Sequence, residues 1–244
     1  MQPALSVQDL SHSFGARKAL DAVSLEVPEG AFTALLGVNG AGKTTLFNLV
    51  TRLYDNRSGR IAVCGHDVRR APREALARLG MVFQSRALDA NLTVAQNFAY
   101  QGALHGMARG EAAERGAALM GRMGLGERLG DKVRGLSGGQ ARRAEIAAAL
   151  LHRPRLVLCD EATVGLDVAA RRDMVADIHR LAAEEGVGVL WATHLIDEIL
   201  PEDRVVVLHE GRVLRSGTAA GIAGDGGLAE AFLAMTGARA DAIA

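Results

Sequence analysis

Nine residues with the composition of a phosphate-binding loop stand in the first fifth of the chain. They fit the pattern Gly, four residues, Gly-Lys-Ser/Thr. In such a loop the backbone N–H groups surround the phosphates, the Lys43 ammonium reaches the β and γ oxygens, and the Thr44 hydroxyl binds Mg²⁺. The sequence therefore predicts a nucleoside triphosphate site. The predicted loop consists of Gly37, Val38, Asn39, Gly40, Ala41, Gly42, Lys43, Thr44 and Thr45.

The elements on either side of this loop are those that a phosphate site needs. The apolar run 31–36 predicts a buried strand, and 46–50 predicts the start of a helix. A strand that turns sharply into a helix aims backbone N–H groups and the positive end of the helix at one point. Lysine is rare in this chain and occurs only at 18, 43 and 132, whereas arginine supplies most of the positive charge. A compact ammonium at the phosphate site explains a lysine at 43.

An acidic pair follows a second predicted strand. Asp160 ends the apolar run 156–160, and Glu161 comes directly after it. A carboxylate at that strand end can hold Mg²⁺ through water opposite Thr44, and Glu161 can polarise a water for in-line attack on the γ-phosphate. The alternative is an acidic pair that only caps the turn. A phosphate loop alone leaves kinase, GTPase, helicase and transporter motor open, and this second motif narrows that choice.

A third motif lies about a hundred residues after the first. Leu136 to Gln140 reads Leu-Ser-Gly-Gly-Gln, and a helix is predicted over 141–151. Serine and two glycines at a helix start form another place where backbone N–H groups can bind an anion. The alternative is an ordinary helix N-cap. One chain therefore carries two loops suited to phosphate.

Composition sets outer limits on function. The chain has 244 residues, 49% of them hydrophobic, with 28 basic and 28 acidic residues, so zero net charge argues against nucleic-acid binding. Cys64 and Cys159 lack partner-like spacing and suggest reduced thiols and a cytosolic protein. No apolar run approaches the ~18 residues of a membrane span, and residues 1–6 show no charged-then-apolar signal. Any membrane-spanning segments are expected to come from another chain.

The order of predicted elements indicates an α/β protein. Strand-like runs occupy residues 5–36, a helix-rich segment covers about 88–150, and apolar strands and helices alternate again over 156–214. In this last part, apolar residues at helical spacing predict a helix over 168–185. Buried strands alternating with amphipathic helices predict a mainly parallel sheet. The tail from about 217 predicts one short helix over 228–235 and an Ala-rich end.

These motifs together resemble the ATP-binding-cassette (ABC) ATPases along nearly the whole chain. Leu-Ser-Gly-Gly-Gln is that family's signature sequence. Residues 37–45 resemble its Walker A loop, 156–160 its Walker B strand, and Glu161 its catalytic glutamate. The resemblance implies a P-loop NTPase core with a mixed, mainly parallel sheet, an N-terminal antiparallel β part and an inserted helical subdomain. A single domain, 1–244, is expected. Its nucleotide-binding core would cover about 1–86 and 153–216, its helical signature subdomain about 87–152, and its C-terminal tail about 217–244.

Four further residues are similar to family positions. Gln84 matches the Q-loop glutamine, which touches Mg²⁺ and the attacking water, and Asp167 lies in the D-loop match Gly-Leu-Asp. His194 matches the switch histidine that contacts the γ-phosphate. Phe14 matches the aromatic that stacks on adenine; the alternative is a packing role, which is common for an aromatic at a strand end. The resemblance implies that Glu161, His194 and Gln84 are the catalytic residues. It implies that Mg²⁺ is bound by Thr44, Gln84 and Asp160. The nucleotide is expected to be bound by residues 37–45 and also by Phe14, Ser137, Gly138, Gly139, Gln140 and Asp167.

Three positions depart from the family pattern. Val38 stands where the family often has proline, at what we expect to be the outer bend of the loop. Ala162 replaces the usual proline after the catalytic glutamate, and Ala148 replaces a common arginine in the helix after the signature. None of the proposed phosphate-facing groups is lost, so we expect a working site.

Functions of different class remain to be separated. An ABC ATPase of translation carries two tandem cassettes, but this chain has one phosphate loop and one signature. The DNA-repair type contains a long coiled coil, and no sustained heptads occur here. A GTPase outside the family is a third possibility, and the guanine-reading Asn-Lys-x-Asp pattern is missing. We therefore expect a transporter ATPase subunit, with a soluble ABC ATPase not tied to transport as the alternative.

The resemblance also implies partners and a location. Two such domains form a head-to-tail homodimer, in which each ATP with its Mg²⁺ lies between the Lys43 loop of one chain and residues 137–139 of the other. Transmembrane permease subunits dock near residues 84–100. The chain is then cytoplasmic and peripheral to the inner face of the cell membrane. Runs such as 160–167 are most similar to the export (ABC-2-like) type. The membrane chains are expected to determine which substrate is transported.

Overall fold

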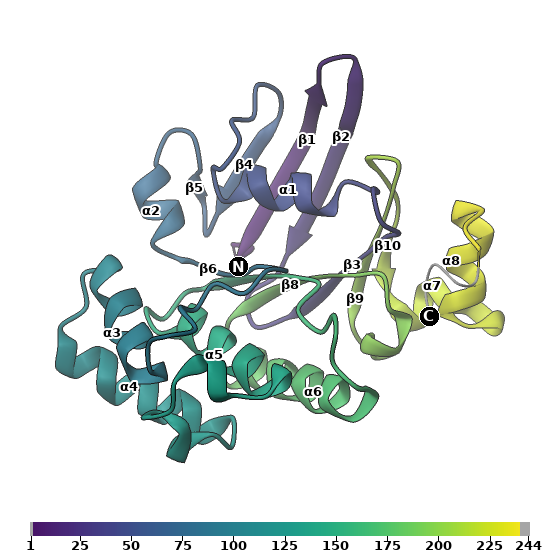
Figure 1. Ribbon diagram of the computed structural model, residues 1–244. Helices are drawn as coiled ribbons and strands as arrows, with labels where there is room; N and C mark the ends of the chain where they lie inside the picture. The colour runs from purple at the N-terminus through teal and green to yellow at the C-terminus, as the bar shows by residue number, and fades with distance from the viewer. Residues whose placement is uncertain (1, 240–244) are drawn as a thin grey trace.

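The computed structural model describes residues 2–239 as an α/β structure built on two sheets (Figure 1). The larger sheet has six strands in the order β10-β9-β3-β8-β7-β6. All its neighbouring pairs are parallel except β10 with β9. Its strands are β3 (Phe32–Leu36), β6 (Leu79–Val82), β7 (Leu156–Asp160), β8 (Gly188–Thr193), β9 (Arg204–His209) and β10 (Arg212–Thr218).

The smaller sheet is antiparallel and stands above the larger one in Figure 1, with helix α1 (Lys43–Val50) lying across it. Its four strands run in the order β2-β1-β4-β5. They are β1 (Leu5–Phe14), β2 (Arg17–Val27), β4 (Arg60–Val63) and β5 (His66–Asp67). The β1–β2 hairpin turns at residues 15–16, which places Phe14 at the end of the first strand.

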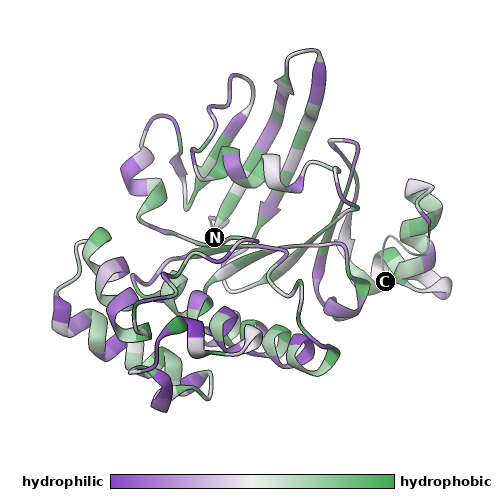
Figure 2. Cartoon of the chain, viewed as in Figure 1, coloured by the Kyte–Doolittle hydropathy of each residue, from purple (hydrophilic) through white to green (hydrophobic). Residues whose placement is uncertain are grey.

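Alternation along the buried strands divides the molecule into two cores. In β7, Val157 and Cys159 pack with the helices of the lower layer, whereas Leu156 and Leu158 pack under α1 and the antiparallel sheet. Successive side chains of a strand point to opposite faces, and both faces of this sheet are covered. The central strands therefore need apolar residues at every position, while β1 and β2 alternate between polar and apolar residues (Figure 2).

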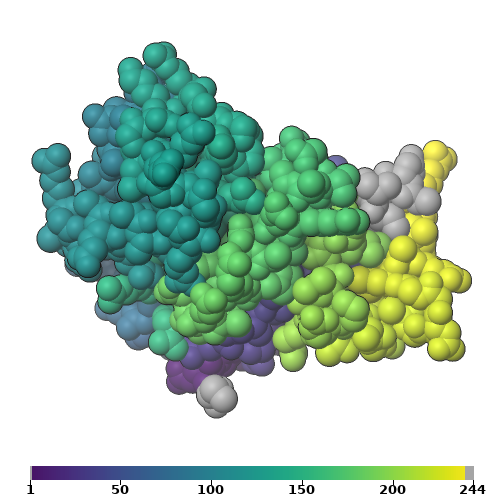
Figure 3. All heavy atoms as spheres, turned by 90° about the horizontal axis from the view of Figure 1, so that it is seen from below, coloured from purple at the N-terminus to yellow at the C-terminus, as the bar shows by residue number. Residues whose placement is uncertain are grey.

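The helices of the lower layer lie at one end of the sheet and beneath it. Helices α3 to α5 form the group at the lower left of Figure 1, and α6 continues below the sheet. Figure 3 shows this group at the opposite end of the molecule from the C-terminal helices. The remaining helices are α2 (Pro72–Leu76), α3 (Val94–Leu104), α4 (Arg109–Arg122), α5 (Gly138–Leu150), α6 (Val168–Glu185), α7 (Ala219–Ala223) and α8 (Leu228–Thr236).

The expected α/β class, parallel sheet and antiparallel N-terminal part are confirmed. Strand β7 and helix α6 have the predicted bounds. The helix predicted over 141–151 begins earlier, at Gly138, because Ser137 caps it. The tail holds α7 as well as the predicted helix, and the Ala-rich end at 240–244 lies outside the described residues. Within residues 2–239, no helix is both long and apolar enough to cross a membrane.

Candidate functional site: a nucleotide site at the strand ends

The site lies where four parallel strands end at one edge of the large sheet. The phosphate loop follows β3, Gln84 follows β6, Glu161 follows β7 and His194 follows β8. Backbone hydrogen bonds extend the register beyond the strands: Gly37 N–H donates to Thr193 O at 3.2 Å. Glu161 N–H likewise donates to Ala192 O at 3.0 Å. The strand pairing thus brings together segments that are far apart in sequence, as is usual for ligand sites in parallel sheets.

Two glycines of the phosphate loop have no room for a side chain. A Cβ on Gly37 would lie 2.5 Å from Leu208 O, and one on Gly42 would lie 2.9 Å from Ala19 O. Gly42 also has a φ of 113° and is the N-cap of α1. Only glycine adopts this backbone without strain. The loop can therefore turn tightly at Gly42, directly before α1 begins at Lys43.

Lys43 and Glu161 form the centre of the site. Lys43 is 5% exposed, and its Nζ lies 3.3 Å from Glu161 Oε1 and donates to Gly37 O at 2.6 Å. Burial lowers the pKa of the Lys43 ammonium, and the Glu161 carboxylate opposes that shift. Glu161 has a φ of 46°, a left-handed backbone that is uncommon for a residue other than glycine. Such strain is typical of functional positions, and here it aims the carboxylate at Lys43.

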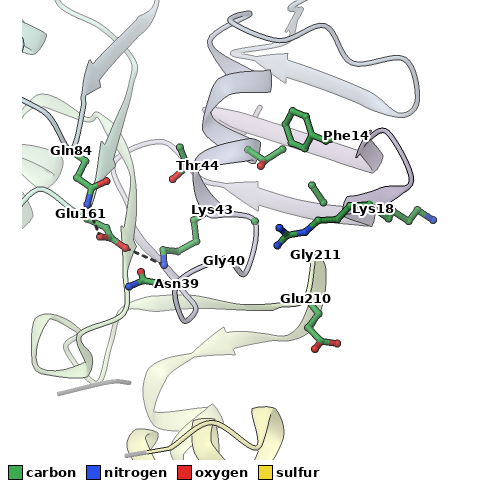
Figure 4. Close-up of a pocket in the computed structure, with 14 residues that line it drawn as sticks. Phe14, Lys18, Asn39, Gly40, Lys43, Thr44, Gln84, Glu161, Glu210 and Gly211 are labelled. Atoms are coloured by element: carbon green, nitrogen blue, oxygen red, sulfur yellow. Dashed lines mark hydrogen bonds and ion pairs between the residues drawn. The ribbon is translucent and has the colours of Figure 1, made fainter. Parts of the chain in front are cut away.

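Two more predicted catalytic residues meet at Glu161. Gln84 Nε2 donates to Glu161 Oε2 at 3.2 Å, and His194 Nδ1 lies 3.3 Å from Glu161 Oε1. Figure 4 shows Gln84, Glu161 and Lys43 converging on one side of the cavity. The three predicted catalytic residues and Lys43 therefore form one contact network, although four separate segments supply them.

The oxygen groups beside this network fit Mg²⁺. Thr44 Oγ1 donates to Asp160 Oδ2 at 3.1 Å, and Asp160 Oδ1 is buried without a hydrogen-bond partner. An unpartnered buried carboxylate oxygen beside a hydroxyl suits a hard cation. Residues 2–239 contain no cluster of three or more His, Cys, Asp or Glu side chains that could hold a metal alone.

A cavity of about 840 Å³ opens beside the loop, and Phe14 lies at its edge. The Phe14 ring is 46% exposed and packs edge-on against His12 and Tyr54, with ring centroids 4.7 and 5.5 Å away. These neighbours hold one side of the ring while the cavity leaves room beside it. The sequence analysis missed His12 and Tyr54, and also five residues that line the cavity: Arg17, Lys18, Ala19, Glu210 and Gly211.

A buried carboxylate that the sequence analysis missed connects two of these segments. Glu198 is 1% exposed and accepts hydrogen bonds from the Trp191 indole, at 2.8 Å, and from the Thr163 hydroxyl. Trp191 lies on β8 ahead of His194, and Thr163 follows Glu161 in the turn after β7. The segments that carry His194 and Glu161 are therefore joined behind the site as well as in it.

The signature residues do not line this cavity. Ser137 is the N-cap of α5, and its hydroxyl accepts from Gln140 N–H at 3.3 Å while Gln140 Oε1 accepts from Ser137 N–H. Asp167 similarly caps α6 by accepting from Ala170 N–H. A Cβ added to Gly138 or Gly139 would be in van der Waals range of Leu166, so the signature and the D-loop segment are neighbours. Within one chain, the predicted nucleotide-binding residues therefore fall into two separate groups.

Comparison with known proteins identifies the family. Residues 20–164 match the family described as ABC transporter. The linearmycin resistance ATP-binding protein LnrL of Bacillus subtilis (strain 168) is 33% identical over 215 residues, covering 88% of this chain and 69% of the relative. The energy-coupling factor transporter ATP-binding protein EcfA1 of Symbiobacterium thermophilum is 36% identical over 230 residues, covering 88% and 79%. This chain belongs to the ABC transporter ATP-binding family.

Solved structures agree with this assignment. An ATP-binding subunit of an ABC transporter superimposes with a TM-score of 0.83 at 28% identity, covering 95% of this chain and 99% of that one. The protein cbiO1 from Clostridium perfringens, part of the ABC transporter complex cbiONQ, gives a TM-score of 0.81 at 28% identity and 89% coverage of both chains. The chain is thus an ABC ATPase domain, and ATP is its ligand.

The side chains at the positions that depart from the ABC pattern are apolar and lie buried or partly buried. Val38 is partly buried and packs against the lower core, so our expectation of an outer bend does not describe its side chain. Ala41 is buried in the upper core and, like Val38 and Gly37, does not line the cavity. Ala162 is fully buried and Ala148 partly buried in the lower core. Small apolar residues fill these positions without removing a charged group from the ATP site.

We expect Phe14→Ala to weaken ATP binding while leaving inorganic tripolyphosphate binding unchanged. Stacking of a base on an aromatic ring contributes about 1–3 kcal/mol, which corresponds to roughly a 5- to 150-fold rise in the Kd for ATP. Isothermal titration of both ligands measures the difference, with Phe14→Trp as the control that keeps a stacking surface. Equal affinity of the Phe14→Ala variant and the parent for ATP would remove adenine stacking from this residue.

Asp160→Asn should stabilise the nucleotide-free chain while abolishing hydrolysis. Burial raises the pKa of Asp160, with the Glu161 charge adding to the shift, although the Thr44 hydrogen bond opposes it. A raised folded-state pKa means that stability falls as pH rises from the unfolded pKa through the folded one, so the ionised carboxylate costs folding energy at neutral pH. Calorimetry at pH 7 should show a higher Tm, by about 2–4 °C per kcal/mol regained. A lower Tm would contradict this account.

Proposed function

We propose that this chain is the ATP-hydrolysing subunit of a membrane ABC transporter, and that it acts as a head-to-tail homodimer bound to separate transmembrane permease subunits. The observation that carries the dimer is the division of the site. The loop at 37–45 opens onto the cavity, whereas residues 137–140 and Asp167 lie outside the set that lines it. A second copy turned by a two-fold rotation can supply both groups to each of two identical sites.

The Lys43–Glu161 ion pair suggests how nucleotide activates the site. The Lys43 ammonium donates a hydrogen bond to Gly37 O and forms an ion pair with Glu161, so its partners belong to its own chain. A triphosphate brings charged oxygens to the loop, and these can replace Glu161 as the partner of Lys43. Glu161 is then free to accept the proton of a water that attacks the γ-phosphorus while the bond to the leaving ADP oxygen breaks.

The other residues at the strand ends hold this geometry. The Gln84 amide fixes one oxygen of Glu161, and His194 lies on the other oxygen, where it can donate to the γ-phosphate. Thr44, Asp160 and Gln84 would hold Mg²⁺, which neutralises phosphate charge when bound. Hydrolysis removes the γ-phosphate that joins the two chains, and the interface can open.

Export is the direction we propose, since the chain resembles resistance proteins. LnrL and the daunorubicin resistance protein DrrA3 of Streptomyces coeruleorubidus, 37% identical over 217 residues, are named for resistance. Other relatives are named for import, such as the Fe(3+) import protein FbpC of Rhizobium etli, 37% identical over 218 residues. Transport assays in inverted vesicles carrying the whole complex separate the two directions, because an exporter accumulates substrate inside them.

Glu161→Gln should bind ATP but lose at least a hundredfold in turnover, since a general base contributes about 10²–10⁴ to a rate. The variant should form an ATP-dependent dimer on size-exclusion chromatography, because the nucleotide that joins the chains is no longer hydrolysed. Lys43→Ala is the matched control, in which nucleotide binding itself is lost in a direct titration. Near-parental phosphate release by Glu161→Gln would exclude this residue as the base.

A permease should bind the exposed face of α3 beside Phe83. Tyr100 and Leu104 are 60% and 64% exposed on this helix, and the residues that follow them, Gln101 and His105, line a groove together with Phe83. Tyr100→Ser with Leu104→Ser should lower the yield of transmembrane chain that copurifies from detergent-solubilised membranes. Leu53→Ser, at a residue 62% exposed after α1, is the control. Unchanged copurification by the double variant would place the permease elsewhere.

A further inference from the structure

The segment that carries Gln84 has no regular structure of its own. Strand β6 ends at Val82, and residues 83–93 form neither helix nor strand. Backbone groups in such a segment need other partners, and a side chain on an unsupported loop is poorly positioned. Gln84 nevertheless meets Glu161 at 3.2 Å. Something outside the loop must therefore fix its backbone.

A buried ion pair on α5 supplies those partners. Arg142 donates to Phe83 O at 2.7 Å and to Gln84 O at 2.8 Å, and it also donates to Glu145 Oε2 at 2.7 Å. The other oxygen of Glu145 accepts from Ala87 N–H at 2.9 Å. Arg142 and Glu145 are 7% and 6% exposed. The planar guanidinium makes these three bonds from two nitrogens held in a fixed geometry, whereas a lysine would have to make them from a single ammonium nitrogen.

The charges of this pair depend on each other. Burial raises the pKa of Glu145, while Arg142 and the Ala87 hydrogen bond oppose that shift. Removing only one partner would leave the other charge buried without compensation. A residue at 142 without a hydrogen-bond donor, such as methionine, would also leave the carbonyls of Phe83 and Gln84 without this partner. The pair and the loop thus form one unit.

We propose that Arg142 and Glu145 are positioning residues that hold Gln84 against Glu161. Both lie on the helix that begins with the signature residues Gly138 to Gln140, so a rigid displacement of α5 carries the backbone of Phe83 and Gln84 with it. Movement of the signature segment in the dimer is in this way coupled to the contact between Gln84 and the base. The proposal concerns hydrolysis by this chain and holds whatever permease it binds.

The test removes both charges together so that no lone charge is buried. Arg142→Met with Glu145→Met keeps side-chain volume, and this pair of changes should lower kcat by about 10- to 100-fold, as misplacement of a catalytic group does, with the KM for ATP changed less than about twofold. Hydrogen exchange of a peptide spanning residues 83–90 should become faster. In a Gln84→Ala background the same two changes should lower kcat less than about twofold further, because the pair acts through Gln84.

A second arginine of the same helical region provides the matched control. Arg115 also donates to two carbonyls, those of Leu150 and Leu151, and to the Glu185 carboxylate. None of these three acceptors belongs to the segment that carries Gln84. Arg115→Met with Glu185→Met should leave kcat and exchange at 83–90 unchanged even if it lowers the Tm.

Any one of several results would overturn the proposal. A parental kcat for the Arg142/Glu145 double variant, a loss that is fully additive with Gln84→Ala, or unchanged hydrogen exchange at residues 83–90 would each do so. A loss confined to KM would also reject it, because the pair would then serve binding rather than the position of Gln84.

Discussion

Parallel pairing of β6, β7, β8 and β3 is the constraint on which the ATP site depends. Because these strands run in the same direction, the segments after them meet at one edge of the sheet. Hydrogen bonds from Gly37 and Glu161 to β8 carry the register past the strand ends. A one-residue slip in any pair would move a functional side chain to the other face. The apolar filling of both cores fixes that register, so packing and site geometry are inseparable here.

One positive and two negative side chains are buried at that edge, so their charges are only partly balanced. Lys43 neutralises Glu161, Gln84 and His194 hold its oxygens, and Asp160 keeps one oxygen without a protein partner. Burial of the Lys43, Asp160 and Glu161 charges costs desolvation energy, and the left-handed backbone of Glu161 adds strain. Such a site gives up folding stability for a geometry that phosphate and metal can complete. The Arg142–Glu145 pair extends the same principle to the loop that carries Gln84.

Local pattern was sufficient to predict the parts of the fold that repeat regularly. Strand β7 and helix α6 were predicted with their bounds, since apolar runs and helical spacing are local properties. Contacts between distant segments depend on how the strands and helices assemble, so local pattern does not predict them. Two examples are the hydrogen bond from Arg142 to the Gln84 carbonyl and the packing of Phe14 against Tyr54. The resemblance placed Gln84 and His194 in the site, but their hydrogen bonds to Glu161 depend on strand order. The early start of α5 at Gly138 was missed because the Ser137 cap was given only as an alternative.

The central claim is that one chain holds half of each ATP site. Complementation tests it most directly. Lys43→Ala lacks a working phosphate loop and Ser137→Arg lacks a working signature, so each variant alone should be inactive. A mixed dimer contains one site built from the intact loop of one chain and the intact signature of the other. ATP hydrolysis in the mixture should therefore rise well above that of either variant, approaching about a quarter of the parental rate if the chains mix randomly and sites act independently. A mixture no more active than its components would contradict the shared site.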